Sequence, residues 1–169
     1  MKKNSKFLIL ILFLIYLVLL VWIILFKLQF SINDLDKTRS VNFMPFYYDK
    51  EIGSSFHLKE VLENVLIFMP MGIYLQMLLS KSNYYKKLMI IGGTSLLLET
   101  AQYVLAIGVS DITDILTNTA GGLLGLILYS MIAHLLGKKE KTNRPFSILG
   151  LIVSVIVVGM LGFILFANQ

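Results

Sequence analysis

The sequence predicts an all-α, polytopic membrane protein, a helical bundle with about five transmembrane helices. Three observations predict this fold. Hydrophobic residues make up 57% of the 169-residue chain and charged residues only 15%, whereas a soluble domain is usually about half apolar and a quarter charged. The apolar residues are gathered in five long runs, and a transmembrane helix needs about 20 such residues. The short links between the last four runs favour antiparallel neighbours.

The first predicted span, Phe7–Phe26, carries no charge and follows Lys2, Lys3 and Lys6. A signal peptide has the same order of features, but this run is longer than a typical apolar core of a signal peptide. No small-x-small cleavage site follows it, so we interpret it as a retained anchor. The other predicted spans are Val61–Leu79, Leu88–Ile107, Ile115–Leu136 and Ile148–Ala167.

The chain divides into three predicted segments. Residues 1–37 hold the signal-anchor helix and the start of an outer loop, residues 38–136 hold the central membrane domain, and residues 137–169 hold a basic cytoplasmic loop and the fifth span. Cytoplasmic loops of membrane proteins are rich in lysine and arginine. The chain is therefore expected to cross the cell membrane several times, with its N-terminus inside and its C-terminus outside. The basic residues that set this orientation are Lys2, Lys3, Lys6, Lys81, Lys86, Lys87, Lys138, Lys139, Lys141 and Arg144.

Composition also excludes several kinds of function. The chain has no cysteine, which excludes disulfides, thiolate catalysis and cysteine-based metal sites. Its two histidines, His57 and His134, are far apart in sequence, which argues against a histidine-rich metal site. The net charge is +5, but the basic residues lie between the apolar runs, where they set the orientation in the membrane. We therefore expect membrane lipid as a partner and no nucleic acid. We expect no cofactor, and a homo-oligomer stays open.

Two stripes of polar residues predict a site under the outer leaflet. Glu99 is separated by one helical turn from Ser95 and from Gln102, so the three share one face of the third span. An antiparallel hairpin that turns about Ser110 would place Gln102 level with Asn118, and Glu99 level with Gly121. Asn64 would join them from the outer end of the second span. The second stripe consists of Asp111, Asp114, Asn118, Gly121 and Gly125.

Glu99 is the candidate functional residue, because a charge at the bilayer centre costs about 2.5–3.5 kcal/mol on insertion scales. It avoids that cost if it is protonated, reaches water, or accepts a hydrogen bond from a donor such as Gln102 or Asn118. The alternative is structural, since polar side chains also link helices. Asp111 and Asp114 are weak candidates for metal ligands. Alternatively, they belong to an ordinary solvated loop in which Asp114 caps the helix.

Glycine, proline and aromatic residues have both structural and functional interpretations. The Gly121–Gly125 pair permits close helix packing. Pro70 removes a backbone hydrogen bond near Leu66 and is expected to kink the second span, which either serves packing or opens a pocket. The aromatic segment around Pro45 is either an interfacial lid over the polar site or a loop that rests on the membrane.

Four motifs, in order, resemble the VanZ-like membrane proteins. They are "VNFMPF" (Val41–Phe46), "ENVLIFMPMG" (Glu63–Gly72), "SLLLETAQ" (Ser95–Gln102) and "DITDILTNTAGGLLG" (Asp111–Gly125). The family's structural motif residues fall here on Asn42, Pro45, Phe46, Phe68, Pro70, Gly72, Gly121 and Gly125, and its polar residues on Asn64, Glu99, Gln102, Asp111, Asp114 and Asn118. One departure is "GVSD", where many members carry an arginine before the aspartates; Arg39 is the candidate to replace it.

The resemblance implies a cell-envelope protein linked to resistance to glycopeptides, above all lipid-tailed ones such as teicoplanin. The leading interpretation is a non-enzymatic protein that binds or excludes a lipid-tailed glycopeptide or a lipid-linked cell-wall precursor at the outer leaflet. One alternative is an intramembrane enzyme with Glu99 as its acid or base. Another is a small lipid transporter or a subunit of one.

Overall fold

The computed structural model describes residues 3–26, 39–46, 54–137 and 139–167. Within them, five helices are long and apolar enough to cross a membrane, which confirms the predicted class. In chain order the elements are α1 (Lys3–Phe26), β1 (Arg39–Asn42), α2 (Ser54–Leu78), α3 (Tyr84–Leu105), β2 (Gly108–Asp111), α4 (Ile112–Leu136) and α5 (Lys139–Ala167).

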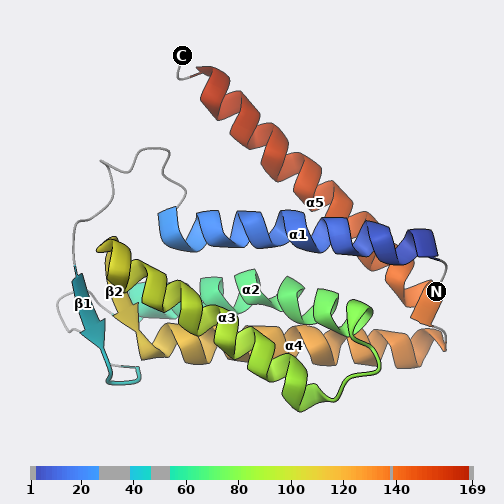
Figure 1. Cartoon of the computed structure of the whole chain (residues 1–169), viewed down its shortest axis with the longest axis horizontal. Coiled ribbons are helices and arrows are strands. Elements are labelled where there is room, and N and C mark those ends of the chain that lie inside the picture. The colour runs from blue at the N-terminus through green and yellow to red at the C-terminus, as the bar shows by residue number, and fades with distance from the viewer. Residues whose placement is uncertain (1–2, 27–38, 47–53, 138, 168–169) are drawn as a thin grey trace.

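Helices α1 to α4 form the body of the molecule, and α5 leaves it at an angle (Figure 1). Successive helices run in opposite directions, so α1, α3 and α5 begin at the end where α2 and α4 finish. The two strands lie at the other end, which we call the strand end. It comprises β1, β2, the last turns of α3 and the first turns of α4.

The strands are a feature that the all-α prediction missed. β1 pairs with β2 in parallel, in a register that runs from Arg39 opposite Gly108 to Asn42 opposite Asp111. Each strand has only four residues, too few to show a clear alternation of polar and apolar side chains. The partners are also far apart in sequence, so no local turn signal marks the pairing.

All five helices begin before the predicted spans, and two of these starts change the interpretation of the sequence. The fourth helix begins at Ile112, and its N-cap is Asp111 rather than Asp114, because the Asp111 carboxylate accepts a 2.7 Å hydrogen bond from the Thr113 amide. The fifth helix begins at Lys139, so the segment expected to be a basic loop is helical. In addition, Lys87 is not a solvated link residue: it is buried in α3, where its ammonium donates to the Gln76 side chain.

Helices α2 and α4 pack backbone against backbone through glycines. A Cβ atom on Gly121 would collide with the backbone of Val65, and one on Gly125 would collide with the backbone of Met69. The predicted close approach of the glycine pair is therefore present, and its partner is α2. On the same interface, Gly72 lies against the backbone of α4.

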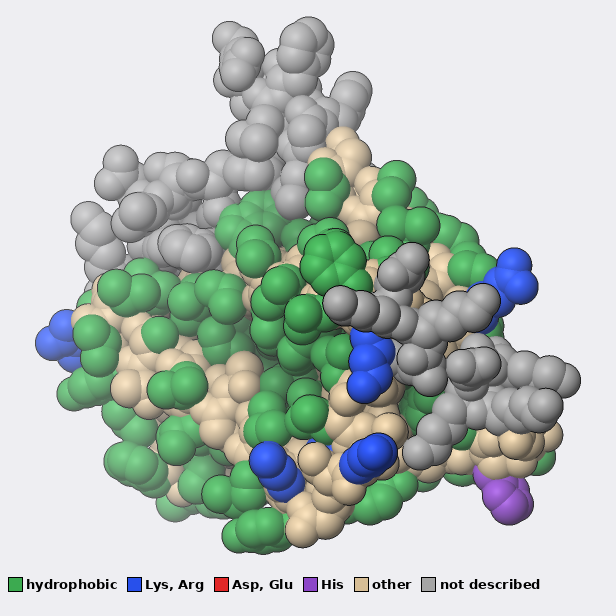
Figure 2. Space-filling model, turned by 45° about the vertical axis from the view of Figure 1, so that its right-hand side comes forward, with side chains coloured by type: hydrophobic (Ala, Val, Ile, Leu, Met, Phe, Trp, Pro, Cys, Tyr) green, Lys and Arg blue, Asp and Glu red, His purple; other side chains and the backbone are tan. Residues whose placement is uncertain are grey.

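The core around this interface is apolar. Phe68, Ile91 and Leu126 have no exposed surface and belong to one cluster that α1 also joins. α2 continues as a helix through Pro70, and the Tyr16 hydroxyl of α1 donates a 2.8 Å hydrogen bond to the carbonyl of Ile67. On the face shown in Figure 2, hydrophobic side chains predominate and no acidic side chain is visible, as expected for a surface in contact with lipid.

The glycine contacts give a stability prediction. Gly125→Ala forces a methyl group into the α2 backbone, and overpacking of this kind costs about 1–3 kcal/mol. We expect a lower thermal unfolding midpoint for this variant in detergent micelles, measured by circular dichroism. Gly93→Ala is the matched control, because nothing lies within 4 Å of a Cβ at Gly93. Equal midpoints for the two variants would contradict the packing.

Candidate functional site

Glu99 lies in the last two turns of α3 and is only 3% exposed. Its Oε2 accepts a 3.0 Å hydrogen bond from the backbone amide of Asp111. The other carboxylate oxygen, Oε1, has no hydrogen-bond partner among the described residues. The Ser110 hydroxyl donates to the backbone carbonyl of Glu99. Thus β2 is fastened to α3 at two neighbouring points, both at Glu99.

The hairpin register predicted about Ser110 is wrong. Asn118 donates a 3.0 Å hydrogen bond to the Ser95 hydroxyl, not to Gln102, and Glu99 lies level with Asp111, not with Gly121. The reason is β2. An extended strand advances about 3.3 Å per residue against 1.5 Å in a helix. The four residues of β2 therefore run back along α3 to the level of Glu99, and α4 begins there rather than at the end of α3.

Asp111 and Asp114 each accept a hydrogen bond from an asparagine side chain. The Asn42 amide of β1 donates to Oδ2 of Asp111 at 2.9 Å, and the Asn64 amide of α2 donates to Oδ1 of Asp114 at 2.7 Å. The remaining oxygen of Asp111 accepts from the Thr113 amide. Asn42, expected only as a motif residue, therefore belongs to the polar cluster.

Gln102 and Asn118 link helices, and neither donates to the Glu99 carboxylate, which was one of the options that the sequence left open. Gln102 donates a 3.1 Å hydrogen bond to the carbonyl of Ile24 in α1. Its own side-chain oxygen, like that of Asn118, is buried without a partner in the described part of the chain. These two residues therefore lie beside the Glu99–Asp111 contact as interhelical links.

Arg39 does not replace the absent arginine of the "GVSD" segment. Its guanidinium donates to the carbonyls of Tyr103 and Val104 at 3.2 and 3.1 Å, and it lies over the Tyr103 ring at 5.5 Å. These carbonyls belong to the last turn of α3, where a cation also interacts favourably with the helix dipole. Arg39 therefore caps α3 and pairs with neither Glu99 nor Asp111.

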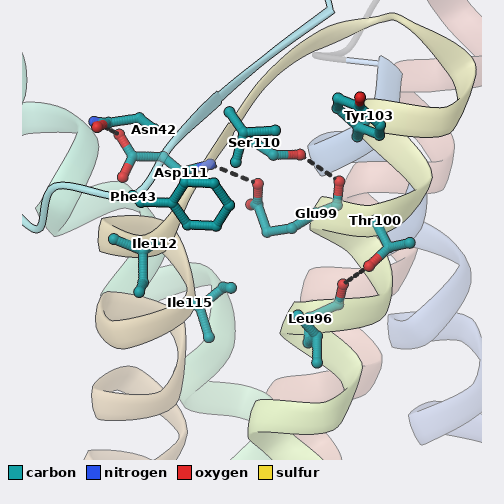
Figure 3. A pocket seen from close by; sticks show the side chains of 11 residues that line it. Asn42, Phe43, Leu96, Glu99, Thr100, Tyr103, Ser110, Asp111, Ile112 and Ile115 are labelled. Carbon is teal, nitrogen blue, oxygen red and sulfur yellow. Dashed lines mark hydrogen bonds between the residues drawn. The ribbon is translucent and has the colours of Figure 1, made fainter.

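A cavity of about 330 Å³ lies between α3, α4 and β1. In Figure 3 the Glu99 side chain extends from α3 toward β2 and α4, and Phe43 lies on the opposite side. Most of the lining is apolar, and the exposed side chains of Phe43 and Leu96 stand on its walls. Helix α2, with Pro70, contributes nothing to it. The lining residues are Val41, Asn42, Phe43, Leu96, Glu99, Thr100, Tyr103, Ser110, Asp111, Ile112 and Ile115.

The segment after β1 is fixed to the start of α4. The amide of Phe46, a residue in the left-handed conformation with φ of 55°, donates to the Thr113 hydroxyl at 3.0 Å. The Met44 amide donates to the Asn42 side chain, so Pro45 lies in an anchored turn. This turn borders the cavity through Phe43. The remainder of the aromatic segment lies outside the described residues.

Among the described residues, no three histidine, aspartate or glutamate side chains come together as metal ligands. Both oxygens of Asp111 accept hydrogen bonds from N–H groups.

Comparison with known proteins identifies the family. A family model described as VanZ/LLP1 matches residues 13–134 of this chain. The chain belongs to the VanZ/LLP1 family. It is 35% identical over 145 residues to Protein VanZ of Enterococcus faecium, and the match covers 85% of this chain and 86% of that protein. No solved structure matches it.

The VanZ-like motifs meet at the strand end. The "VNFMPF" segment supplies Asn42, the second motif supplies Asn64, the third supplies Glu99, and the fourth supplies Asp111 and Asp114. The motif residues Phe68, Gly72, Gly121 and Gly125 are buried in helix packing instead.

Two residues that contact the site were not predicted from the sequence. Ser110 donates a hydrogen bond from β2 to the Glu99 carbonyl, and the Thr113 hydroxyl accepts one from the Phe46 amide at the start of α4. Ser110 and Thr113 flank Asp111 in the motif, and that proximity is a usable signal. Phe43 belongs to the aromatic segment for which a lid or a membrane-resting loop was expected, and its place on the cavity wall follows from the pairing of β1 with β2.

The strand pairing can be tested by cross-linking. Ser40 and Val109 are Cα partners in the β1–β2 register, and neighbouring strands lie about 4.8 Å apart, within the Cα range of a disulfide. We expect Ser40→Cys/Val109→Cys to form an intramolecular disulfide under mild oxidation, detected by a gel shift that a reductant reverses. The chain has no other cysteine.

The control is Ser40→Cys/Tyr85→Cys, which joins opposite ends of the bundle. The pairing is contradicted if Ser40→Cys/Val109→Cys yields no more cross-link than this control.

Proposed function

We propose that this VanZ family protein contributes to resistance to lipid-tailed glycopeptides of the teicoplanin type, by holding the apolar part of an amphiphile in the cavity at its strand end. The observation that carries the proposal is the cavity itself: apolar walls beside a buried carboxylate, between membrane-spanning helices. Binding sites for small molecules commonly combine apolar walls with a few well-placed polar groups.

The proposal places the strand end under the outer leaflet. Exposed basic side chains gather at the opposite end, on Lys6, Lys81, Lys86 and Arg144, and an excess of lysine and arginine marks the cytoplasmic side. A ligand that arrives from outside the cell would then meet the Phe43 side of the cavity first.

The size of the cavity limits what it holds. Its volume of about 330 Å³ lies near the lower end of the range of about 300–1,000 Å³ for ligand pockets. It has room for part of one alkyl or acyl chain, and no room for a whole glycopeptide. We therefore expect the protein to bind the lipid tail in the cavity and to leave the peptide core of the glycopeptide outside it.

The experiment compares teicoplanin with vancomycin, which lacks a lipid tail. In a susceptible Gram-positive host, expression of the protein should raise the minimum inhibitory concentration of teicoplanin more than that of vancomycin. Glu99→Gln keeps an oxygen that accepts the Asp111 amide but removes the ionisable carboxyl group. We expect it to lose most of the protection and to weaken teicoplanin binding about tenfold, equivalent to about 1.4 kcal/mol, in purified protein.

The matched control is Glu63→Gln, since Glu63 is an exposed acid 56% open to solvent, paired with Lys59. It should protect as the wild type does. A cysteine at Met44 that an impermeant maleimide labels in intact cells checks the orientation in the same strain. Equal protection against both drugs, or full protection by a well-expressed Glu99→Gln protein, would count against the proposal.

A further inference from the structure

The two acidic residues that line the cavity have neutral partners. Glu99 accepts one hydrogen bond, from a backbone amide, and Asp111 accepts two, from a backbone amide and the Asn42 side chain. In the part of the chain that the structure describes, no lysine or arginine forms an ion pair with either carboxylate. Arg39, the cation that β1 brings to the strand end, is bonded to carbonyls of α3.

One acceptor at the cavity remains unused. Oε1 of Glu99 has no partner among the described residues, although the side chain as a whole is only 3% exposed. An unused acceptor on a buried carboxylate is costly at membrane depth unless a donor or a cation reaches it. The structure thus offers a buried carboxyl oxygen that a ligand can complete.

The surroundings of Glu99 orient such a ligand. Leu96 and Ile115 line the cavity one helical turn farther from the strand end than Glu99 and Asp111. A head group at Glu99 therefore directs its chain past Leu96 and Ile115, toward the middle of the bundle. Leu96 is 54% exposed, so this side of the cavity is open to the surrounding lipid, and an amphiphile can enter sideways from the leaflet.

We infer that the cavity takes a cationic amphiphile: an ammonium head group bound to Oε1 of Glu99 in the field of Asp111, with one alkyl chain along Leu96 and Ile115. This inference rests on the proposed function and specifies the head group that its site prefers. An ammonium supplies the charge and the N–H donors that the cavity lacks. An ammonium also stabilises the ionised form of Glu99, whereas an anionic head group beside Glu99 and Asp111 would disfavour it and a neutral head group would not stabilise it.

The test uses two probes with the same brominated dodecyl chain, one with a primary ammonium head and one with a hydroxyl head. The protein is placed in phosphatidylcholine nanodiscs with Trp22→Phe and Phe43→Trp, so that its one tryptophan stands on the cavity wall and bromine in the bound chain quenches it. Probe concentrations are corrected for partition into protein-free nanodiscs. We expect the ammonium probe to bind at least about tenfold more tightly than the alcohol.

Substitutions assign the preference to a residue. In the same background, Glu99→Gln should bind both probes about equally, and Glu63→Gln should keep the ammonium preference. Helical content measured by circular dichroism verifies that each variant is folded.

The outcomes separate the inference from the proposed function. Equal quenching by both probes in the protein with Trp22→Phe and Phe43→Trp would overturn the cationic preference but would still support a binding site for amphiphiles. No quenching by either probe would overturn both. An ammonium preference that survives Glu99→Gln would overturn the assignment to Glu99.

Discussion

The structure at the strand end depends on how the backbone of β2 is satisfied beside membrane-spanning helices. Peptide groups in the apolar part of a bilayer find no water, so an extended segment is tolerated there only where protein groups bond it. β2 obtains these bonds from β1 along one edge and from Glu99 at its end, where Oε2 accepts the Asp111 amide. Glu99, although it lies within a membrane-spanning helix, therefore serves first as a hydrogen-bond acceptor for the neighbouring strand β2.

That arrangement also creates the cavity. Because β2 runs back along α3 before α4 begins, the two helices are held apart at the strand end, and β1 with Phe43 closes the gap from the outside. Farther along, the glycines at 121 and 125 hold α4 against the backbone of α2. α4 is thus packed against α2, and at the strand end the cavity between α4 and α3 has apolar walls and one carboxyl oxygen without a partner among the described residues.

The sequence was informative where a feature is long or periodic. Five apolar runs predicted five helices, and the one-turn spacing around Glu99 predicted a polar face that packs inward, with Glu99 and Gln102 buried. The predicted hairpin register was wrong because the four residues of β2 show no pattern that predicts an extended segment. Missing that segment shifts every predicted contact between α3 and α4. The pairing of Asn42 with Asp111 joins positions 69 residues apart, a separation at which local patterns carry no information.

The central claim is that the carboxylate of Glu99 holds the Asp111 amide within the bundle. Hydrogen exchange measured by NMR on the ¹⁵N-labelled protein in nanodiscs tests it at a single residue. In the wild type the Asp111 amide should exchange slowly. In Glu99→Ala it should exchange about tenfold faster, as expected for a lost hydrogen bond worth about 1.4 kcal/mol, while the Thr113 amide, bonded to Asp111 itself, stays protected. Rapid exchange of Asp111 in the wild type, or no change in the variant, would contradict the account.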